Sequence, residues 1–421
     1  MRMPRSRVRP RPASPAERTD PPPDAVRRLL RALLLNFGIT SIACYALLPV
    51  LPVLLADWAS GPVSVGLVLF AFSALRFCGF LVVDRVDLTR VRPVLVLSLA
   101  SAAALVGGAA LMQRQRTVMV VLLLGVAVCM SINSVVVRAC IGEFVATPEA
   151  RVAASSRLMV VTNLCSAAGP MLGAVLFSSS TQAWLLVTAG VFSISSLVTA
   201  VAVPGGLRLA LDQSAARRGW MRIALGNPAL LRTAVASFLC FVLYAQLFSA
   251  MPLYVFGADH PAAGGSLFLI NAVLIVVLQV PVGKVAGRYM ADRRGGFRMF
   301  GVVALFMAAA FALTGFAELR MPLLIAAIVL FTLGETVLGA VNDQAFVGVK
   351  GDLDTLSAVK ARMLVTALGQ AVGAFLGGSG ALAMADRWDF ASYWYTIAAL
   401  GIFTVVLSAA KSLRTARCHV G

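Results

Sequence analysis

Residues 118–140 read VMVVLLLGVAVCMSINSVVVRAC. The 20 residues from Val118 to Val137 carry no charge, and the run ends at Arg138. A helix needs about 20 apolar residues to cross the roughly 30 Å hydrocarbon core of a bilayer. Strands of an outer-membrane barrel alternate apolar and polar positions instead. The stretch therefore predicts a transmembrane helix and excludes a barrel strand.

Stretches of this kind fill most of the chain. Twelve of them run near 30–55, 62–83, 93–112, 118–140, 153–177, 183–203, 232–255, 265–286, 299–317, 321–342, 360–384 and 390–410. Of the 421 residues, 60% are hydrophobic and 13% are charged, and the mean hydropathy is +0.89. Such a chain lacks the charged residues that cover a soluble domain, and it is too apolar to stay disordered. We predict an all-α membrane protein with 12 transmembrane helices.

The basic residues predict the orientation of these spans. The net charge of +18 would, on its own, suggest binding to nucleic acid or to an acidic membrane surface. With the N-terminus placed in the cytoplasm, 31 of the 36 lysines and arginines fall on the cytoplasmic side and four in outer loops. Cytoplasmic loops are the ones enriched in these residues. We therefore expect a multi-pass protein of the cell membrane with both termini in the cytoplasm, held against an anionic inner leaflet, and no nucleic-acid partner.

The longest internal loop divides the chain into two halves, which resemble each other at an offset near 203 residues. Asp84-Arg85 at the end of one span, for example, aligns with Gly287-Arg288 in the other half. Such a duplication is typical of paired membrane bundles. The expected organisation is a flexible basic tail at 1–28, a six-helix bundle at 29–203, a cytoplasmic linker at 204–231, a second six-helix bundle at 232–410 and a cytoplasmic tail at 411–421.

Polar side chains separate the spans into two groups. The spans at 93–112, 183–203, 299–317 and 390–410 hold no charged residue, and no Asn or Gln away from their ends, whereas each of the others holds at least one. Polar groups inside a membrane are costly unless they face protein or water. We therefore expect two pseudo-symmetric six-helix bundles around a central cavity. The candidates for proton coupling or substrate binding are Glu335, Arg76, Asn133, Gln246, Asn271, Gln279 and Gln370.

The segment that follows the span at 62–83 carries a family resemblance. It reads Gly79-Phe-Leu-Val-Val-Asp84-Arg85-Val-Asp87-Leu-Thr-Arg90-Val-Arg92. This resembles the G-x-x-x-D-R-x-G-R-R marker of the major facilitator superfamily, with the first glycine displaced by one position and Asp87 in place of the second. The second half keeps Gly283 and Arg288 at the matching spacing. The resemblance covers nearly the whole chain and implies the twelve-helix fold of that family.

Charged residues near the cytoplasmic ends of the spans are candidates for a cytoplasmic gate. The resemblance implies this role for the marker loop, and ion pairs among the remaining residues would close the inner side. Anchoring at the membrane interface is the alternative interpretation. The candidates are Asp84, Arg85, Arg138, Glu143, Arg157, Asp343 and Arg288.

Two glycine-containing segments point to close helix packing. Residues 163–174 read NLCSAAGPMLGA, and Gly169, Pro170 and Gly173 resemble part of the Gly-Pro-x-x-Gly signature of the drug/proton antiporter branch. The spacing of Gly369, Gly373 and Gly377 lets two helices approach closely. Prolines inside the spans are expected to kink or end helices. These prolines are Pro49, Pro52, Pro170, Pro252 and Pro281.

Two charged residues lie well inside spans. Burial disfavours the charged form of a carboxylate, so Glu335 can bind and release a proton, or it can be a structural residue paired across the bundle. Arg76 can bind an anionic substrate, pair with an acid in the cavity, or extend to the cytoplasmic interface. We favour a structural or gating role for Arg76 and leave both interpretations of Glu335 open.

The function predicted is secondary transport by alternating access. We expect proton-coupled efflux of a small lipophilic or amphipathic compound, with import or facilitated uptake of a small organic solute as the alternative and a non-transporting receptor or assembly protein as a minor one. The chain has no Walker A pattern and no catalytic motif, so neither enzyme activity nor a cofactor is expected. Its scattered cysteines and two histidines predict no metal site. We expect the partners to be the solute, protons and lipid, and the functional unit to be a monomer.

Overall fold

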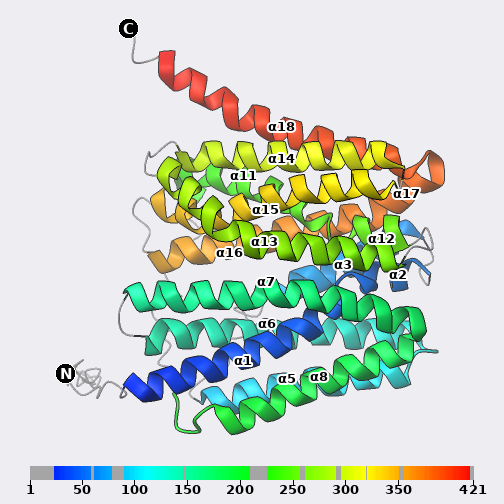
Figure 1. Ribbon diagram of the computed structural model, residues 1–421, viewed down its shortest axis with the longest axis vertical. Coiled ribbons are helices and arrows are strands. Elements are labelled where there is room, and N and C mark those ends of the chain that lie inside the picture. Colours follow the sequence, from blue (N-terminus) through cyan, green and yellow to red (C-terminus); the bar gives the residue numbers. More distant parts are fainter. Residues whose placement is uncertain are drawn as a thin grey trace, which may run out of the picture.

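The computed structural model describes residues 23–57, 61–77, 90–145, 148–208, 225–256, 261–290, 295–318, 320–349 and 355–417. Every regular element in these ranges is a helix, as the sequence predicts (Figure 1). The helices form two stacked groups, one from each half of the chain. The first described helix begins and the last one ends at the same end of the molecule (Figure 1).

The first half supplies one of these groups. Its helices are α1 (Pro23–Leu47), α2 (Val50–Ala56), α3 (Pro62–Phe77), α5 (Val91–Leu111), α6 (Arg116–Phe144), α7 (Pro148–Ser179) and α8 (Thr181–Ala202). Helices α5 and α8 pack together at the outer edge, and α3 and α7 contact the other half (Figure 1).

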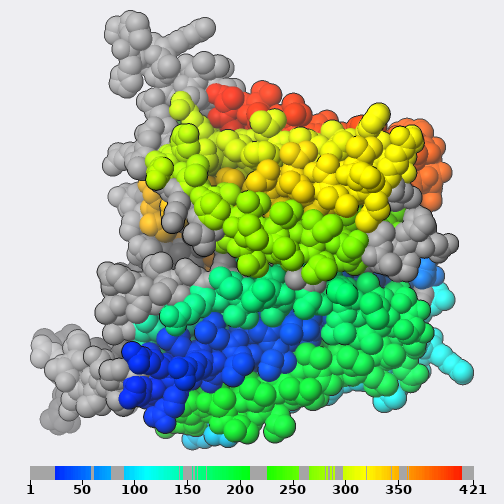
Figure 2. Space-filling model, viewed as in Figure 1, coloured from blue at the N-terminus to red at the C-terminus, as the bar shows by residue number. Residues whose placement is uncertain are grey.

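The second half repeats this arrangement. Its helices are α11 (Pro228–Ala245), α12 (Ala250–Phe256), α13 (Pro261–Met290), α14 (Gly295–Ala317), α15 (Met321–Gly348), α16 (Thr355–Phe375), a π-helical segment η2 (Leu376–Gly380), α17 (Ala381–Arg387) and α18 (Phe390–Arg417). Helix α16 packs against α3, and α13 packs against α7, across the boundary between the halves. The space-filling view shows the two halves one above the other, blue to green and yellow-green to red (Figure 2).

The described helices match the predicted spans. Ten of them are long and apolar enough to cross a membrane, and two shorter apolar helices, Pro62–Arg76 and Gly265–Gln279, complete the set. The four spans that hold no charged residue and no internal amide are α5, α8, α14 and α18, and all four expose large apolar side chains. Examples are Leu97, Val201, Phe316 and Val406. Apolar residues on the outside of a helical bundle are what lipid contact requires.

The first and seventh spans are each broken into two helices, close to prolines that are expected to kink or end a helix. Helix α1 ends at Leu47 and α2 begins at Val50, while α11 ends at Ala245 and α12 begins at Ala250. Proline lacks the N–H that would bond to the carbonyl four residues earlier. Pro52 and Pro252 each follow a break and leave the carbonyls of Leu48 and Phe248 without that helical donor. In contrast, α7 and α13 continue through Pro170 and Pro281.

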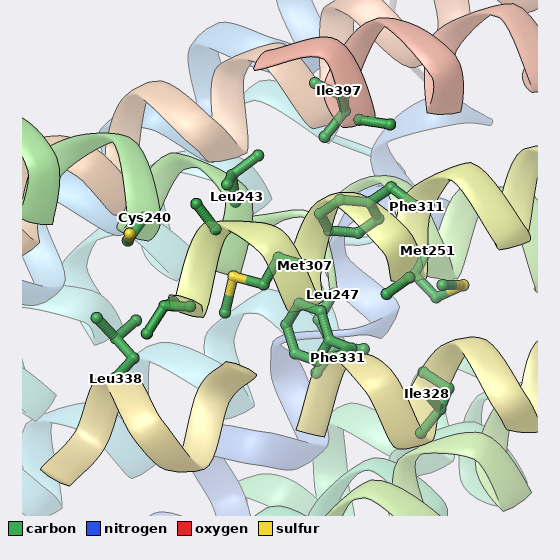
Figure 3. Close-up of a cluster of buried hydrophobic side chains, with 14 of the residues drawn as sticks. Cys240, Leu243, Leu247, Met251, Met307, Phe311, Ile328, Phe331, Leu338 and Ile397 are labelled. Carbon is green, nitrogen blue, oxygen red and sulfur yellow. The ribbon is translucent and has the colours of Figure 1, made fainter. Parts of the chain in front are cut away.

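Apolar side chains fill the inside of each half. In the second half Leu243, Met307, Phe311 and Phe331 point toward one another from α11, α14 and α15 (Figure 3). In the first half the fully buried Trp184 of α8 donates its ring N–H to the Ala46 carbonyl of α1 at 3.0 Å. The indole thereby packs in the core while its one donor is satisfied.

Glycines permit the closest helix approaches in both halves. A Cβ built on Gly169 or Gly173 of α7 would meet Tyr45 or Ala46 of α1. The second half has the same relation between α16 and α11. There a Cβ on Gly369 would lie 2.7 Å from the Phe238 carbonyl oxygen, and one on Gly373 would lie 2.6 Å from the Val242 carbonyl oxygen. The helix that contains the break is thus held against a glycine-bearing helix in each half.

Candidate functional site

A small cavity lies between the two halves. It holds about 40 Å³, enough for a few water molecules and too little for an organic solute. Its lining comes from the breaks in the first and seventh spans and from α3 and α16. The lining residues are Tyr45, Leu48, Leu51, Leu69, Phe72, Ser73, Arg76, Tyr244, Ala245, Phe248, Ser249, Gln370 and Ala374.

Helix α3 forms much of the wall contributed by the first half. Phe72 and Ser73 lie three and four residues after Leu69, and Arg76 lies four and three residues after them, so these side chains share one face of the helix. Tyr45 completes this wall from the last turn of α1. The wall is apolar apart from a hydroxyl group, a phenol and a guanidinium.

Aromatic rings form much of the opposite wall. Phe248, in the break between α11 and α12, lies 6.1 Å from the ring of Tyr45 and 5.8 Å from that of Tyr244. Behind them, the Tyr244 ring stacks on Phe331 with centroids 6.2 Å apart, and Phe248 stacks on Phe268 at 5.8 Å. Such rings provide a large apolar surface with hydroxyl groups at the edge.

Glu335 lies beside this aromatic wall on α15. Its Oε2 accepts a hydrogen bond of 2.9 Å from the Nδ2 of Asn271 on α13. The same Nδ2 donates to Thr332 Oγ1 at 3.0 Å, which fixes the amide, and Asn271 is only 4% exposed. The Tyr244 hydroxyl also interacts with the Glu335 carboxylate. The structure thus brings together two of the predicted residues and one tyrosine.

Arg76 faces the cavity from the last turn of α3. It is close enough to Tyr45 and Tyr244 to interact with both electrostatically. Tyr244 therefore interacts with the Glu335 carboxylate and also, electrostatically, with Arg76.

The remaining predicted binding residues lie in different surroundings. Gln370 lines the cavity from α16. Gln246 is fully buried and joins three helices, because its amide donates to the carbonyls of Val242 (2.8 Å) and Gly373 (3.0 Å) and accepts from the Tyr393 hydroxyl (2.6 Å). Gln279 is half-buried on α13 and is not part of the cavity lining. The structure therefore places Gln246 among helix-joining residues.

Asn133 belongs to a polar network within the first half. Its Nδ2 donates to Asn36 Oδ1 at 3.1 Å, and Asn36 donates to Thr199 Oγ1 at 2.7 Å. The hydroxyls of Thr40 and Ser195 are 2.9 Å apart in the same network. These groups join α1, α6 and α8 and do not line the cavity.

The gate residues stay a prediction. Arg138, Glu143, Arg157 and Arg288 are exposed, and the Arg138 guanidinium lies 5.7 Å from the centroid of the Phe37 ring. Asp343 is on α15. Asp84 and Arg85 lie outside the described residues.

Sequence reasoning missed the tyrosines and phenylalanines of the cavity. Tyr45 and Tyr244 each precede a helix break that is followed by a proline, and they lie 199 residues apart, close to the offset between the halves. If tyrosines had been counted with asparagines and glutamines as polar residues of the spans, both Tyr45 and Tyr244 would have been candidates. Phe72 and Phe248 carry no such signal, because an apolar residue in a span faces lipid as readily as a cavity.

Among the described residues, no group of three histidine, cysteine or acidic side chains is placed to hold a metal ion. The groups at or beside the cavity that could bind a ligand are hydrogen-bonding side chains, one guanidinium, one carboxylate and aromatic rings. Small-molecule binding sites combine apolar surface with a few polar groups in this way.

Two stacked helical halves with a cavity between them are an architecture that recurs among membrane transporters. The family model of the Major Facilitator Superfamily matches residues 33–350, and the chain belongs to that family. It is a transporter and not an enzyme.

Solved structures share the fold at low sequence identity. A POT family transporter in complex with a thioalcohol-conjugated peptide is 11% identical, with a TM-score of 0.71 over 93% of this chain and 99% of that one. A POT family transporter in complex with 5-aminolevulinic acid is 11% identical, with a TM-score of 0.69 over 91% and 95%. The nucleoside transporter NupG is 14% identical, with a TM-score of 0.67 over 92% and 98%. A search of curated protein sequences finds no relative.

Proposed function

We propose that this transporter moves a small amphipathic or lipophilic solute by alternating access, coupled to protons. The observation that supports this most is the aromatic cavity between the halves with Glu335 beside it. The cavity is too small for a solute as it stands, so transport requires the two halves to separate on one side and then on the other.

The described conformation is tightly packed at the end of the molecule away from the described chain ends. There a Cβ built on Gly66 of α3 would lie 2.8 Å from the Phe375 carbonyl oxygen, and one on Gly378 of η2 would lie 2.7 Å from Leu69. Helix α2 also packs against α12 at this end. With both termini in the cytoplasm, as the basic residues favour, this end is the outer one, and the conformation is closed to the outside.

Glu335 is the proton-binding group of this proposal. Its half-buried carboxylate accepts a hydrogen bond from Asn271 beside the cavity, where it can take up and release a proton. When the cavity opens to a different side, the group exchanges its proton with a different compartment. The same proposal includes a gating role for the charged cytoplasmic residues and a linker at 204–231 between the two bundles. It also includes a location in the cell membrane and a monomeric functional unit.

Two directions of transport are open to such a site. Export in exchange for protons is favoured by the resemblance of Gly169, Pro170 and Gly173 to the drug/proton antiporter signature. Import together with protons is the second candidate. It is favoured by the interaction of Tyr244 with both Arg76 and Glu335, and the similar solved structures include peptide and nucleoside transporters.

Proteoliposomes with an imposed pH gradient test the proposal. Wild-type protein is expected to accumulate or expel a fluorescent amphipathic dye as the gradient dictates, and a protonophore is expected to abolish this. Glu335→Gln should lose gradient-driven transport by roughly 10- to 100-fold while keeping gradient-independent exchange of the dye.

The matched control is Glu318→Gln, since Glu318 is exposed in the loop before α15. The control should behave as wild type. Full gradient-driven transport by folded Glu335→Gln protein would contradict proton coupling at this residue. The sign of the gradient that drives accumulation separates export from import.

A further inference from the structure

Arg76 is the one charged side chain among the described residues that line the cavity. It is half-buried, and it comes from a helix face that is otherwise apolar or weakly polar. A guanidinium offers five N–H donors in a planar fork that matches a carboxylate, a phosphate or a sulfonate. Its position in the lining puts this fork where a bound solute would lie.

Hydroxyl donors surround the guanidinium. Tyr45 of the first half and Tyr244 of the second half both interact with Arg76 and both line the cavity. Ser73 lies one turn before it on the same face. Phenol and alcohol groups can donate hydrogen bonds to an anion as readily as they accept them. The polar part of the lining therefore suits a negatively charged group.

The rest of the lining suits a hydrocarbon body. Leu51, Leu69 and Phe72 line one side and Phe248 lines the other, close to Tyr45. Leucine and aromatic side chains provide apolar contact and offer ring faces for stacking. The lining is thus divided into a cationic, hydroxyl-rich part and an apolar part.

We infer that the substrate is an amphipathic organic monoanion, with its charged group bound by Arg76 and its apolar body against Phe72 and Phe248. This rests on the proposed transport of an amphipathic solute, in either direction. A cation of the same shape is rejected because like charges repel strongly away from water. A neutral analogue does not make the charge-assisted hydrogen bonds that an anion makes with a guanidinium.

A series of three naphthalene probes tests the inference. Naphthalene-1-sulfonate, naphthalene-1-sulfonamide and trimethyl(1-naphthyl)ammonium share a ring and differ in charge. Equilibrium dialysis against purified protein measures binding, and flux into proteoliposomes measures transport. Wild-type protein is expected to bind the sulfonate about tenfold more tightly than the other two. Arg76→Gln should bring this ratio near one, with little change for the sulfonamide.

Two further variants complete the design. Arg76→Lys should keep part of the preference, because it keeps the charge and loses the fork. Arg320→Gln, at an exposed arginine, should keep all of it. Equal binding of the three probes by wild-type protein, or an unchanged ratio in folded Arg76→Gln, would overturn the inference. If Arg76→Gln does not fold, the wild-type ratio and Arg76→Lys still decide.

The two readouts separate this inference from the proposed function. Anion-selective binding that depends on Arg76, without flux of any probe, would support the inferred site and contradict transport of such solutes. Flux of all three probes at equal rates would support transport and overturn the anion preference.

Discussion

The two halves of the molecule share their mechanics and differ in their chemistry. In each half a tyrosine precedes a break in the first helix, and a glycine-bearing helix packs against that helix. The first half adds a cation to the cavity through Arg76. The second half adds Gln370 to the lining and Glu335 beside it.

The two halves thus repeat the packing and the helix breaks of the fold but not the charged groups of the cavity. Packing and bending must work in both halves, so glycines and prolines recur at matching places. A binding site needs each charged group once, because two equal charges in one cavity would repel each other. Pseudo-symmetry therefore describes the helices of this transporter better than it describes its cavity.

The largest stability change is expected where the shared packing is tightest. Gly373→Ala puts a methyl group 2.6 Å from the Val242 carbonyl oxygen, and an overpacked interface of this kind costs about 3 kcal/mol. Thermal unfolding in detergent should show a clear fall in Tm. Gly190→Ala, which adds its methyl to open space on α8, is the matched control.

The corresponding substitution in the first half is Gly169→Ala. Its methyl would meet Tyr45 on α1, so a similar fall in Tm is expected. A large fall in one half and none in the other would mean that the two halves do not share the packing described here.

A smaller change is expected from Gln246→Ala. The substitution leaves the Tyr393 hydroxyl and the Gly373 carbonyl without their partner, which costs about 2 kcal/mol. Gln370→Ala, at the cavity, should instead alter solute binding with little change in Tm. Dialysis and thermal unfolding on both variants check this, and a reversed pattern would place Gln246 in the binding site.

The smallest changes are expected at two helix caps that begin the last span of each half. Ser180 accepts from the backbone of Gln182 and Ala183, and Ser180→Ala should cost about 1 kcal/mol. Asp389 accepts from the Ser392 backbone N–H at 2.7 Å, and the hydrogen bonds from Ser392 lower the pKa of Asp389.

The lowered pKa gives the Asp389 cap a pH dependence with a definite sign. Its contribution is present above the ordinary range of aspartate titration and is lost as the pH falls through the lowered value. The difference in Tm between wild type and Asp389→Ala should therefore stay constant from neutral pH to mild acid and vanish only in stronger acid. Ser180→Ala should show no such trend.

Much of the fold could be predicted from the sequence. The stretch at 118–140 lies within α6 (Arg116–Phe144), and the four spans without charges or internal amides are the ones at the outer edges. The breaks could not be predicted from proline alone. Pro52 and Pro252 follow breaks while α13 continues through Pro281, because neighbouring helices decide whether a freed carbonyl ends the helix.

Less of the candidate site could be predicted. Arg76, Gln370, Asn271 and Glu335 fall at or beside the cavity, since charges and amides are rare enough in a span to be noticed. The interpretation of Gln246 depended on contacts 127 and 147 residues away along the chain, which no local pattern reveals. Aromatic residues in apolar spans were indistinguishable from lipid-facing ones.

The two helix breaks have a mechanical consequence. The segments beyond them, α2 and α12, are seven residues each, which is about 10 Å of helix. Each is joined to its main helix by backbone that already lacks part of the regular hydrogen bonding. A displacement of α2 and α12 breaks few hydrogen bonds, so the packing at this end of the molecule can loosen while the long helices keep their partners. The two short helices can therefore move separately from the long ones, and their motion can have a timescale of its own.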